Sequence, residues 1–326
     1  GSTGGVGVTR VVASAPGKVV LSGEYAVLGE APAICMAVDR RARAEINPFD
    51  GDWHRVRAPG HSDIEGRFLI RSGRVEWLQG GDEFDLVAAV VEVIEPSTST
   101  SLFIDLDTRE FRDSASGDKL GLGSSAALTV ALSAALKRTL DVLSDSMTAH
   151  RYLQQGAGSG VDIAAAVQGG LIEYRRRDNV ITPLSWPAGL HYRLLWSGKS
   201  SSTQEKLSRY AAVENRQSRE LLERAAVNMA KAWRSGSHVL SAFPAYIDTL
   251  RQFSVDHDLG IFDAGHDQLV AEAQAAGLVY KPCGAGGGDI GILLGPSDVE
   301  LDEFVADGRQ LLECALAPVG VTLELH

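Results

Sequence analysis

Two short segments of the 326-residue chain are dense in glycine and could bind an anion. They read GLGSSAA at 121–127 and GAGGG at 284–288. Because glycine carries no Cβ and reaches positive φ, such a backbone can approach a phosphate closely and turn its amides inward. A helix that starts directly after the loop adds unpaired amides and its dipole. The first segment leads into the run 128–140, so it is either an anion-binding loop or a tight turn with a serine N-cap.

The first loop does not match the common nucleotide-binding patterns. The Walker pattern GxxxxGK[ST] is absent, and the third glycine of the dinucleotide pattern is missing. Ser124 and Ser125 nevertheless provide hydroxyls that could bind a phosphate or a Mg²⁺ ion. The presence of two such loops in one chain favours ligand binding over two unrelated turns.

Two charged residues interrupt apolar stretches. Lys18 follows Pro-Gly within a strand-like run, where it is either a functional cation or a side chain that extends to the surface. Asp162 lies within GVDIAAAV, where it is either an exposed residue at the start of a helix or a buried carboxylate with a chemical role.

Composition and charge exclude several classes of protein. A formal net charge of −11 argues against a nucleic-acid surface. No apolar run reaches the roughly 18 residues of a membrane span, and the first residues show no secretion leader. The three cysteines (Cys35, Cys283 and Cys314) are odd in number and widely spaced, so neither a disulfide framework nor a zinc cluster is expected. We expect a cytoplasmic location. FDAGHD at 262–267 is interpreted as a helix start capped by Asp263, in preference to a metal site.

The elements that must position these residues follow from periodicity and turn signals. Strands are expected at 9–28 (two strands joined by a bend), 34–46, 51–60, 65–78, 102–108, 170–177, 191–198, 278–295 (two strands around the glycine loop) and 320–325. Helices are expected at 82–94, 125–140, 145–155, 161–169, 203–234, 239–255, 264–276 and 298–315. The β-rich first half and the mixed second half predict an α+β protein of two domains, 8–187 and 188–326.

Three segments together resemble the motifs of the GHMP kinases, the superfamily of galactokinase, homoserine kinase, mevalonate kinase and phosphomevalonate kinase. They are APGKVVLSGEYAVL, KLGLGSSAALTVAL and KPCGAGGGDIGILL, in this order. GEYAVL, QGAGSGVDIAAAVQGG and KPxGAGGGD are most similar to the phosphomevalonate kinases. The resemblance implies a β-rich N-terminal domain, a ferredoxin-like C-terminal domain, and ATP and a small acceptor bound in the cleft between them.

The resemblance also implies roles for individual residues. Lys18 and Asp162 would face the transferring phosphate, and Ser125 would bind Mg²⁺. The ATP-binding residues would be Lys119, Gly121, Leu122, Gly123, Ser124, Ser125 and Ala126. The acceptor would be bound by Ser22, Glu24, Tyr25, Ser159, Gly160, Lys199, Ser200 and Ser202, together with the third motif, 284–289, through Gly284, Gly286 and Gly287. The hydroxyl-rich segment 200–203 has a second interpretation, a simple helix cap.

The implied reaction is transfer of the γ-phosphoryl group of ATP to phosphomevalonate. A mevalonate kinase or another alcohol-directed GHMP kinase is the alternative, and a non-catalytic nucleotide-binding regulator is an alternative of another class. Two departures from the family pattern stand out. His150 and Arg151 occupy the neighbourhood in which mevalonate kinases place a Mg²⁺-binding glutamate, and Cys283 replaces an expected Ser or Thr as either a packed or a redox-sensitive thiol. The sequence leaves monomer and homodimer open.

Overall fold

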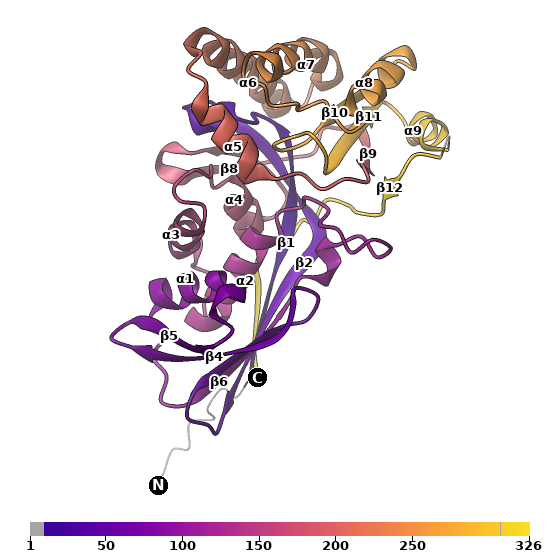
Figure 1. The fold of residues 1–326 in the computed structure, drawn as a ribbon. Helices are drawn as coiled ribbons and strands as arrows, with labels where there is room; N and C mark the ends of the chain where they lie inside the picture. Colours follow the sequence, from indigo (N-terminus) through magenta and orange to yellow (C-terminus); the bar gives the residue numbers. More distant parts are fainter. Residues whose placement is uncertain (1–9, 307) are drawn as a thin grey trace.

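The computed structural model describes residues 10–306 and 308–326, and these form two sheets with separate sets of helices (Figure 1). The larger sheet has the strand order β13-β1-β2-β6-β3-β4-β5, with β7 paired to β2 and β8 paired to β7. Its strands are β1 (Val11–Ser22), β2 (Ala33–Phe49), β3 (His54–Ala58), β4 (Ser62–Arg71), β5 (Arg74–Gln79), β6 (Ser101–Asp107), β7 (Leu171–Arg175), β8 (Val180–Leu184) and β13 (Thr322–Leu325). We call this sheet and the helices on it the first lobe.

The first strand differs from the prediction of two strands joined by a bend. β1 is continuous from Val11 to Ser22 and pairs antiparallel with β2 along its length. The Pro16–Gly17 step is a register shift within this pairing. A bulge of this kind bends a strand without ending it, so the predicted break is wrong although the local distortion is real.

Four helices pack on one face of the large sheet, as Figure 1 shows. They are α1 (Asp85–Ile94), α2 (Ser124–Lys137), α3 (Leu143–Leu153) and α4 (Val161–Gln168). The central helix α2 buries small side chains, among them Ala127, Ala131 and Ala134, against β1 and β2. Because these side chains are short, the helix lies close to the strands, and its N-terminus is fixed relative to Lys18 on β1.

The second lobe contains the smaller antiparallel sheet, with the order β10-β11-β9-β12. Its strands are β9 (His191–Trp196), β10 (Val279–Pro282), β11 (Ile290–Gly295) and β12 (Leu311–Leu312). The helices of this half are α5 (Thr203–Ala212), α6 (Arg216–Ser235), α7 (Val239–Asp256), α8 (His266–Ala275) and α9 (Asp298–Val305). Helix α6 also contacts β1 and β2, so the two lobes pack together.

Three predicted features of the second lobe are wrong. The helix expected at 203–234 is two helices, because the Asn215 side chain caps α6 by accepting a hydrogen bond from the Ser218 amide at 3.0 Å. The helix expected at 298–315 ends at Val305, and pairing of β12 with β9 replaces its last part. Helix α8 starts after Gly265 without a cap from Asp263, and its first residue, His266, is fully buried instead of solvated.

The division near residue 187 falls between β8 and β9, and we retain it as a proposed boundary. One strand crosses it: β13, from the C-terminus, pairs with β1 in the first lobe. Among the described helices, none is both long and apolar enough to cross a membrane.

Candidate active site

The loop before α2 has the backbone that the glycine pattern predicts. Gly121 and Gly123 have φ values of 77° and 76°, and Gly123 is the N-cap of α2. No described side chain caps this helix, so the predicted alternative of a serine N-cap is wrong. The amides of its first turn and the positive end of its dipole therefore remain available to an anion.

This loop is fixed to β1 at the position of Lys18. The Lys18 amide donates to the carbonyl of Leu122 at 2.8 Å. A Cβ on Gly17 would lie 2.6 Å from the same carbonyl oxygen, so this close approach requires glycine. The Lys18 side chain then lies along Gly123, where an added Cβ would be 3.2 Å from its Cγ and Cε atoms. The Lys18 side chain therefore approaches the site along the face of the loop that packs on β1.

Asp162 lies in the first turn of α4, which starts after Gly160 in the left-handed conformation. Its half-buried carboxylate accepts a hydrogen bond from the Ile163 amide at 3.0 Å. Both Asp162 and Lys18 act on the buried thiol of Cys35: burial raises the pKa of Cys35 to about 12, with Lys18 opposing the shift and Asp162 adding to it. Lys18 and Asp162 are far apart in the sequence, yet in the fold both act electrostatically on this one residue of β2.

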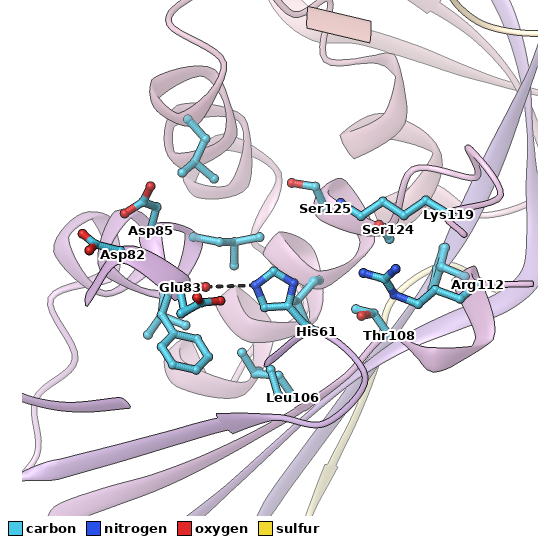
Figure 2. Close-up of a pocket in the computed structure, with 17 residues that line it drawn as sticks. His61, Asp82, Glu83, Asp85, Leu106, Thr108, Arg112, Lys119, Ser124 and Ser125 are labelled. Carbon is cyan, nitrogen blue, oxygen red and sulfur yellow. Dashed lines mark hydrogen bonds between the residues drawn. The ribbon is translucent and has the colours of Figure 1, made fainter. Parts of the chain in front are cut away.

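A cavity of about 350 Å³ opens beside the start of α2. Lys119, Ser124 and Ser125 line one side of it, and Figure 2 shows the Lys119 side chain extended toward Ser125. The opposite side is formed by the start of α1 and the turn before it. The other polar residues of the lining are His61, Asp82, Glu83, Asp85, Thr108 and Arg112.

The sequence did not indicate these last six residues as part of a site. Nε2 of His61 lies 2.9 Å from the carbonyl oxygen of Glu83, which fixes the wall of the cavity, and the Arg112 guanidinium points into it (Figure 2). The acidic turn 82–85 was interpreted only as the beginning of a helix. Its place opposite Ser125 depends on the packing of α1 beside α2, and no motif indicates that packing.

The surroundings of Ser125 fit a Mg²⁺ ion that arrives with a nucleotide. Its exposed hydroxyl faces the cavity, and Nε2 of the buried His150 lies 3.3 Å from Oγ. Within the described residues, no group of three or more His, Cys, Asp and Glu side chains could hold a metal. Mg²⁺ keeps several waters and is commonly held by few protein ligands plus substrate phosphates, so one hydroxyl beside a triphosphate loop is a suitable donor set.

Two of the three first-motif residues expected to bind the acceptor, Glu24 and Tyr25, have side-chain partners inside the protein. Glu24 is almost fully buried, and its carboxylate binds the Lys281 ammonium and the Tyr246 hydroxyl of the second lobe. The Tyr25 hydroxyl donates to the carbonyl of Ala285 at 2.7 Å. Ser22 is fully buried, and its hydroxyl has no hydrogen-bond partner among the described residues. We therefore infer that Ser22, Glu24 and Tyr25 form the wall behind the acceptor site and do not contact the acceptor directly.

Ser159 and Gly160 lie next to Asp162, on a turn that Tyr174 holds. The Tyr174 hydroxyl donates to the carbonyl of Ser159 at 2.9 Å, and an added Cβ on Gly160 would lie 2.8 Å from that hydroxyl. Arg151 donates to Oδ1 of Asn179 at 2.8 Å, and Tyr174 contacts the same oxygen. Arg151, at the place where a glutamate was expected, therefore belongs to the same group of contacts as Tyr174, which holds the turn before Asp162.

The segment 199–202 connects the two glycine loops. The Ser200 hydroxyl donates to the carbonyl of Lys119 at 2.6 Å, and the Ser201 hydroxyl donates to the carbonyl of Gly286 at 2.7 Å. Ser202 caps α5, as in the second interpretation of this segment. The Lys199 side chain is exposed.

The second glycine loop, 284–288, is held by the protein itself. Tyr25, Ser201 and His266 donate hydrogen bonds to the carbonyls of Ala285, Gly286 and Gly288. The Lys18 ammonium lies 3.8 Å from the position of a Cβ on Gly284, so the two glycine loops face the same cation.

Comparisons with known proteins identify the class of protein that this fold and site define. Residues 87–170 match the family described as GHMP kinases N terminal domain. The chain is 28% identical to phosphomevalonate kinase of Streptomyces sp. (strain CL190), over 98% of this chain and 99% of that protein. It is 30% identical to mevalonate kinase of Pyrococcus abyssi, over 88% of this chain and 89% of that protein.

Solved structures show the same fold. Lin0012 from Listeria innocua superposes with a TM-score of 0.84 at 22% identity, covering 97% of this chain and 99% of that one. Streptococcus pneumoniae phosphomevalonate kinase, in complex with phosphomevalonate and AMPPNP, superposes with a TM-score of 0.77 at 20% identity, covering 94% and 99%. The chain belongs to the GHMP kinase family. It is an ATP-dependent phosphotransferase, and the predicted α+β fold is confirmed.

Proposed function

We propose that this protein transfers the γ-phosphoryl group of ATP to phosphomevalonate, which yields diphosphomevalonate and ADP. The observation that carries the proposal is the group of Lys18, Asp162 and the uncapped start of α2 around one point. The likeness to the Streptomyces phosphomevalonate kinase along nearly the whole of both chains supports this choice of acceptor.

The chemistry of a phosphate acceptor suits the charges of the site. A phosphate monoester has a second pKa of about 6 and is mostly a dianion at neutral pH, so its oxygen needs no general base. That oxygen bonds to the γ-phosphorus while the bond from the γ-phosphorus to the β–γ bridging oxygen breaks, and ADP leaves. The main cost is the approach of two anions. Lys18 and the amides of α2 lower that cost, and Arg151 in place of a glutamate changes the local charge in the same direction.

The remaining parts of the site have positioning roles in this proposal. Residues 119–126 hold the triphosphate, and the cavity beside them holds the nucleoside. Ser125 is the protein ligand for Mg²⁺, which when bound neutralises charge on the phosphates. Asp162 orients the acceptor and Lys18 and does not remove a proton.

The experiment is an assay of ADP release with phosphomevalonate, mevalonate, homoserine and galactose as separate acceptors. We expect turnover with phosphomevalonate to exceed that with every alcohol. Turnover with mevalonate alone would replace this proposal with the second candidate, a mevalonate kinase, which the 30% identity to the Pyrococcus protein favours.

The variant Asp162→Asn separates the two candidates by mechanism. With a phosphate acceptor the rate should fall only slightly, because no proton must be removed. With an alcohol acceptor the loss of a general base should cost about 10²–10⁴-fold. A large loss of turnover with phosphomevalonate would therefore contradict the role given to Asp162.

A further inference from the structure

Asp289 is the residue at which three segments of the site meet, and the proposed chemistry gives it no role. It directly follows the second glycine loop and precedes β11. Its φ is 55°, a left-handed conformation that Asp adopts more readily than most residues. The residue is nearly buried, with 9% exposure.

Asp289 holds the segment 197–201 by three hydrogen bonds. Its amide donates to the carbonyl of Lys199 at 2.7 Å, and its carbonyl accepts from the Ser197 amide at 2.9 Å. Oδ1 accepts from the Ser201 amide at 2.9 Å. A hydrogen bond to a charged group contributes about 1.5–3 kcal/mol, so the carboxylate fixes the loop that carries Ser200 and Ser201.

The same side chain packs against the ATP-binding loop of the other lobe. An added Cβ on Gly121 would lie 2.3 Å from Cγ of Asp289 and 2.6 Å from Oδ2. The glycine at position 121 is thus required by the carboxylate that lies on it as well as by its φ. Within the segment that Asp289 holds, the Ser200 hydroxyl donates a hydrogen bond to the carbonyl of Lys119, at the start of this loop.

Lys18 balances the charge of this carboxylate. Burial raises the pKa of Asp289, and the Ser201 amide and Lys18 oppose that shift. The ammonium that faces the transferring phosphate therefore also faces Asp289. A shift of Asp289 would move the loop 119–121, the segment 199–201 and the surroundings of Lys18 together.

We propose that Asp289 is a positioning residue that sets the distance between the ATP-binding loop and the segment 199–202. It does so by bonding the segment through its backbone and carboxylate while its side chain lies on Gly121. The proposal rests on the assignment of residues 119–126 to ATP, and it holds whichever acceptor the enzyme uses.

The test compares Asp289→Ala with Asp289→Asn. Asparagine keeps the size of the side chain and an oxygen that can accept the Ser201 amide, whereas alanine removes both. We expect Asp289→Ala to lower kcat/KM for the acceptor by up to about 10²-fold, the effect of a misplacement of about 1 Å. We expect Asp289→Asn to retain most of the wild-type rate. The control Asp267→Ala removes an exposed aspartate of the same lobe, paired only with Arg251 in the described contacts, and should change neither rate nor affinity.

A second measurement does not depend on turnover. Hydrogen exchange of the free enzyme should be faster in Asp289→Ala than in wild type at 119–123 in one lobe and at 197–202 in the other. If Asp289→Ala does not fold, Ser200→Ala breaks the link to Lys119 and should show the same pattern at 119–123 to a smaller degree.

Two results would overturn the proposal. Equal losses in Asp289→Asn and Asp289→Ala would show that the charge acts and the positioning does not. Unchanged exchange at 119–123 in Asp289→Ala or Ser200→Ala would show that the residue acts only within its own lobe. Both results would leave the choice of acceptor untouched, since they are obtained with whichever acceptor is turned over or with none.

Discussion

The two glycine loops share positive-φ glycines but have different surroundings. In the first loop, 119–125, positive-φ glycines lead into an uncapped helix, and the serines that follow line an open cavity. In the second loop, 284–288, positive-φ glycines are surrounded by side chains that bind three of its carbonyls, those of Ala285, Gly286 and Gly288. The first loop leaves the amides at the start of α2 available to a ligand, although the carbonyls of Lys119 and Leu122 accept hydrogen bonds from Ser200 and Lys18. The second loop gives its carbonyls to side chains of the protein.

The difference shows that glycine content indicates an unusual backbone but not its partner. The donors to the second loop come from both lobes: Tyr25 from the first, and Ser201 and His266 from the second. Behind them lies the buried group of Glu24, Lys281 and Tyr246, which also joins the two lobes. The second loop is therefore part of the contact between the two lobes, which we call the joint, and we propose that the first loop is part of the binding site. The predictions below test this division.

The largest expected effect is that of Lys18→Met on catalysis. The substitution removes the cation that lies under the first loop and faces both glycine loops. We expect kcat to fall on the order of 10³–10⁵-fold, as when a charge-stabilising group is removed from phosphoryl transfer. The free energy of unfolding should change far less than kcat, since methionine keeps most of the apolar stem and the Ser201 amide still bonds the Asp289 carboxylate. Steady-state kinetics and urea unfolding check this, with Lys137→Met on the surface as the control. An active Lys18→Met enzyme would remove Lys18 from the mechanism.

The next largest effect is on the free energy of unfolding and concerns the buried Glu24–Lys281 pair behind the joint. Lys281→Met leaves the Glu24 carboxylate buried without its cation, which should cost about 3–5 kcal/mol of unfolding free energy. The exposed i,i+4 pair of Arg216 and Glu220 is the control, and Arg216→Ala should cost only about 0.3–0.5 kcal/mol. Urea unfolding of both variants gives the comparison. Equal costs would mean that the buried pair does not hold the lobes together.

The sequence predicted the α+β fold, most helices and strands, and the backbone of the first loop. These features depend on local signals: periodicity, Pro-Gly and glycine spacing, and the small residues of α2. The close placement of Lys18 and Asp162 came from the family resemblance, because residues so far apart share no local pattern.

What the sequence could not predict are the contacts between distant segments. Glu24 was assigned to the acceptor because nothing around it in the sequence shows that Lys281 and Tyr246 enclose it. The polar wall formed by His61, Asp85 and their neighbours was missed for the same reason. The helix predicted at 298–315 has a helical pattern up to Val305, but strand pairing with β9 overrides local preference beyond it.

A smaller effect compares one glycine from each loop. Gly123→Ala forces a left-handed residue and adds a Cβ 3.2 Å from Lys18 atoms, so it should weaken ATP binding with about 1–2 kcal/mol of destabilisation. Gly286→Ala adds a Cβ 2.7 Å from the carbonyl oxygen of Ile261, which belongs to the backbone and cannot easily move. Gly286→Ala should therefore lose more stability and less ATP affinity than Gly123→Ala.

Gly236→Ala is the control for backbone strain alone, because Gly236 has a similar φ and no neighbour within 4 Å of an added Cβ. Calorimetric ATP titration and thermal unfolding separate the two quantities, and the same loss of affinity in both loop variants would argue against the division.

The smallest expected effect concerns Cys283, which precedes the second loop and replaces the expected Ser or Thr. Burial raises the pKa of its thiol to about 11, and Sγ lies 3.8 Å from the carbonyl oxygen of Lys281. At pH 8 the thiolate fraction is therefore far below that of an ordinary thiol, whose pKa is about 8.5. Native enzyme should react slowly with iodoacetamide at this position, as followed by mass spectrometry of the labelled peptide.

The substitution Cys283→Ser should lower the free energy of unfolding by less than about 1.5 kcal/mol and keep the wild-type rate, since a hydroxyl can donate to the same carbonyl. Rapid labelling that ATP prevents would show instead that the joint opens and that this thiol reaches the nucleotide site.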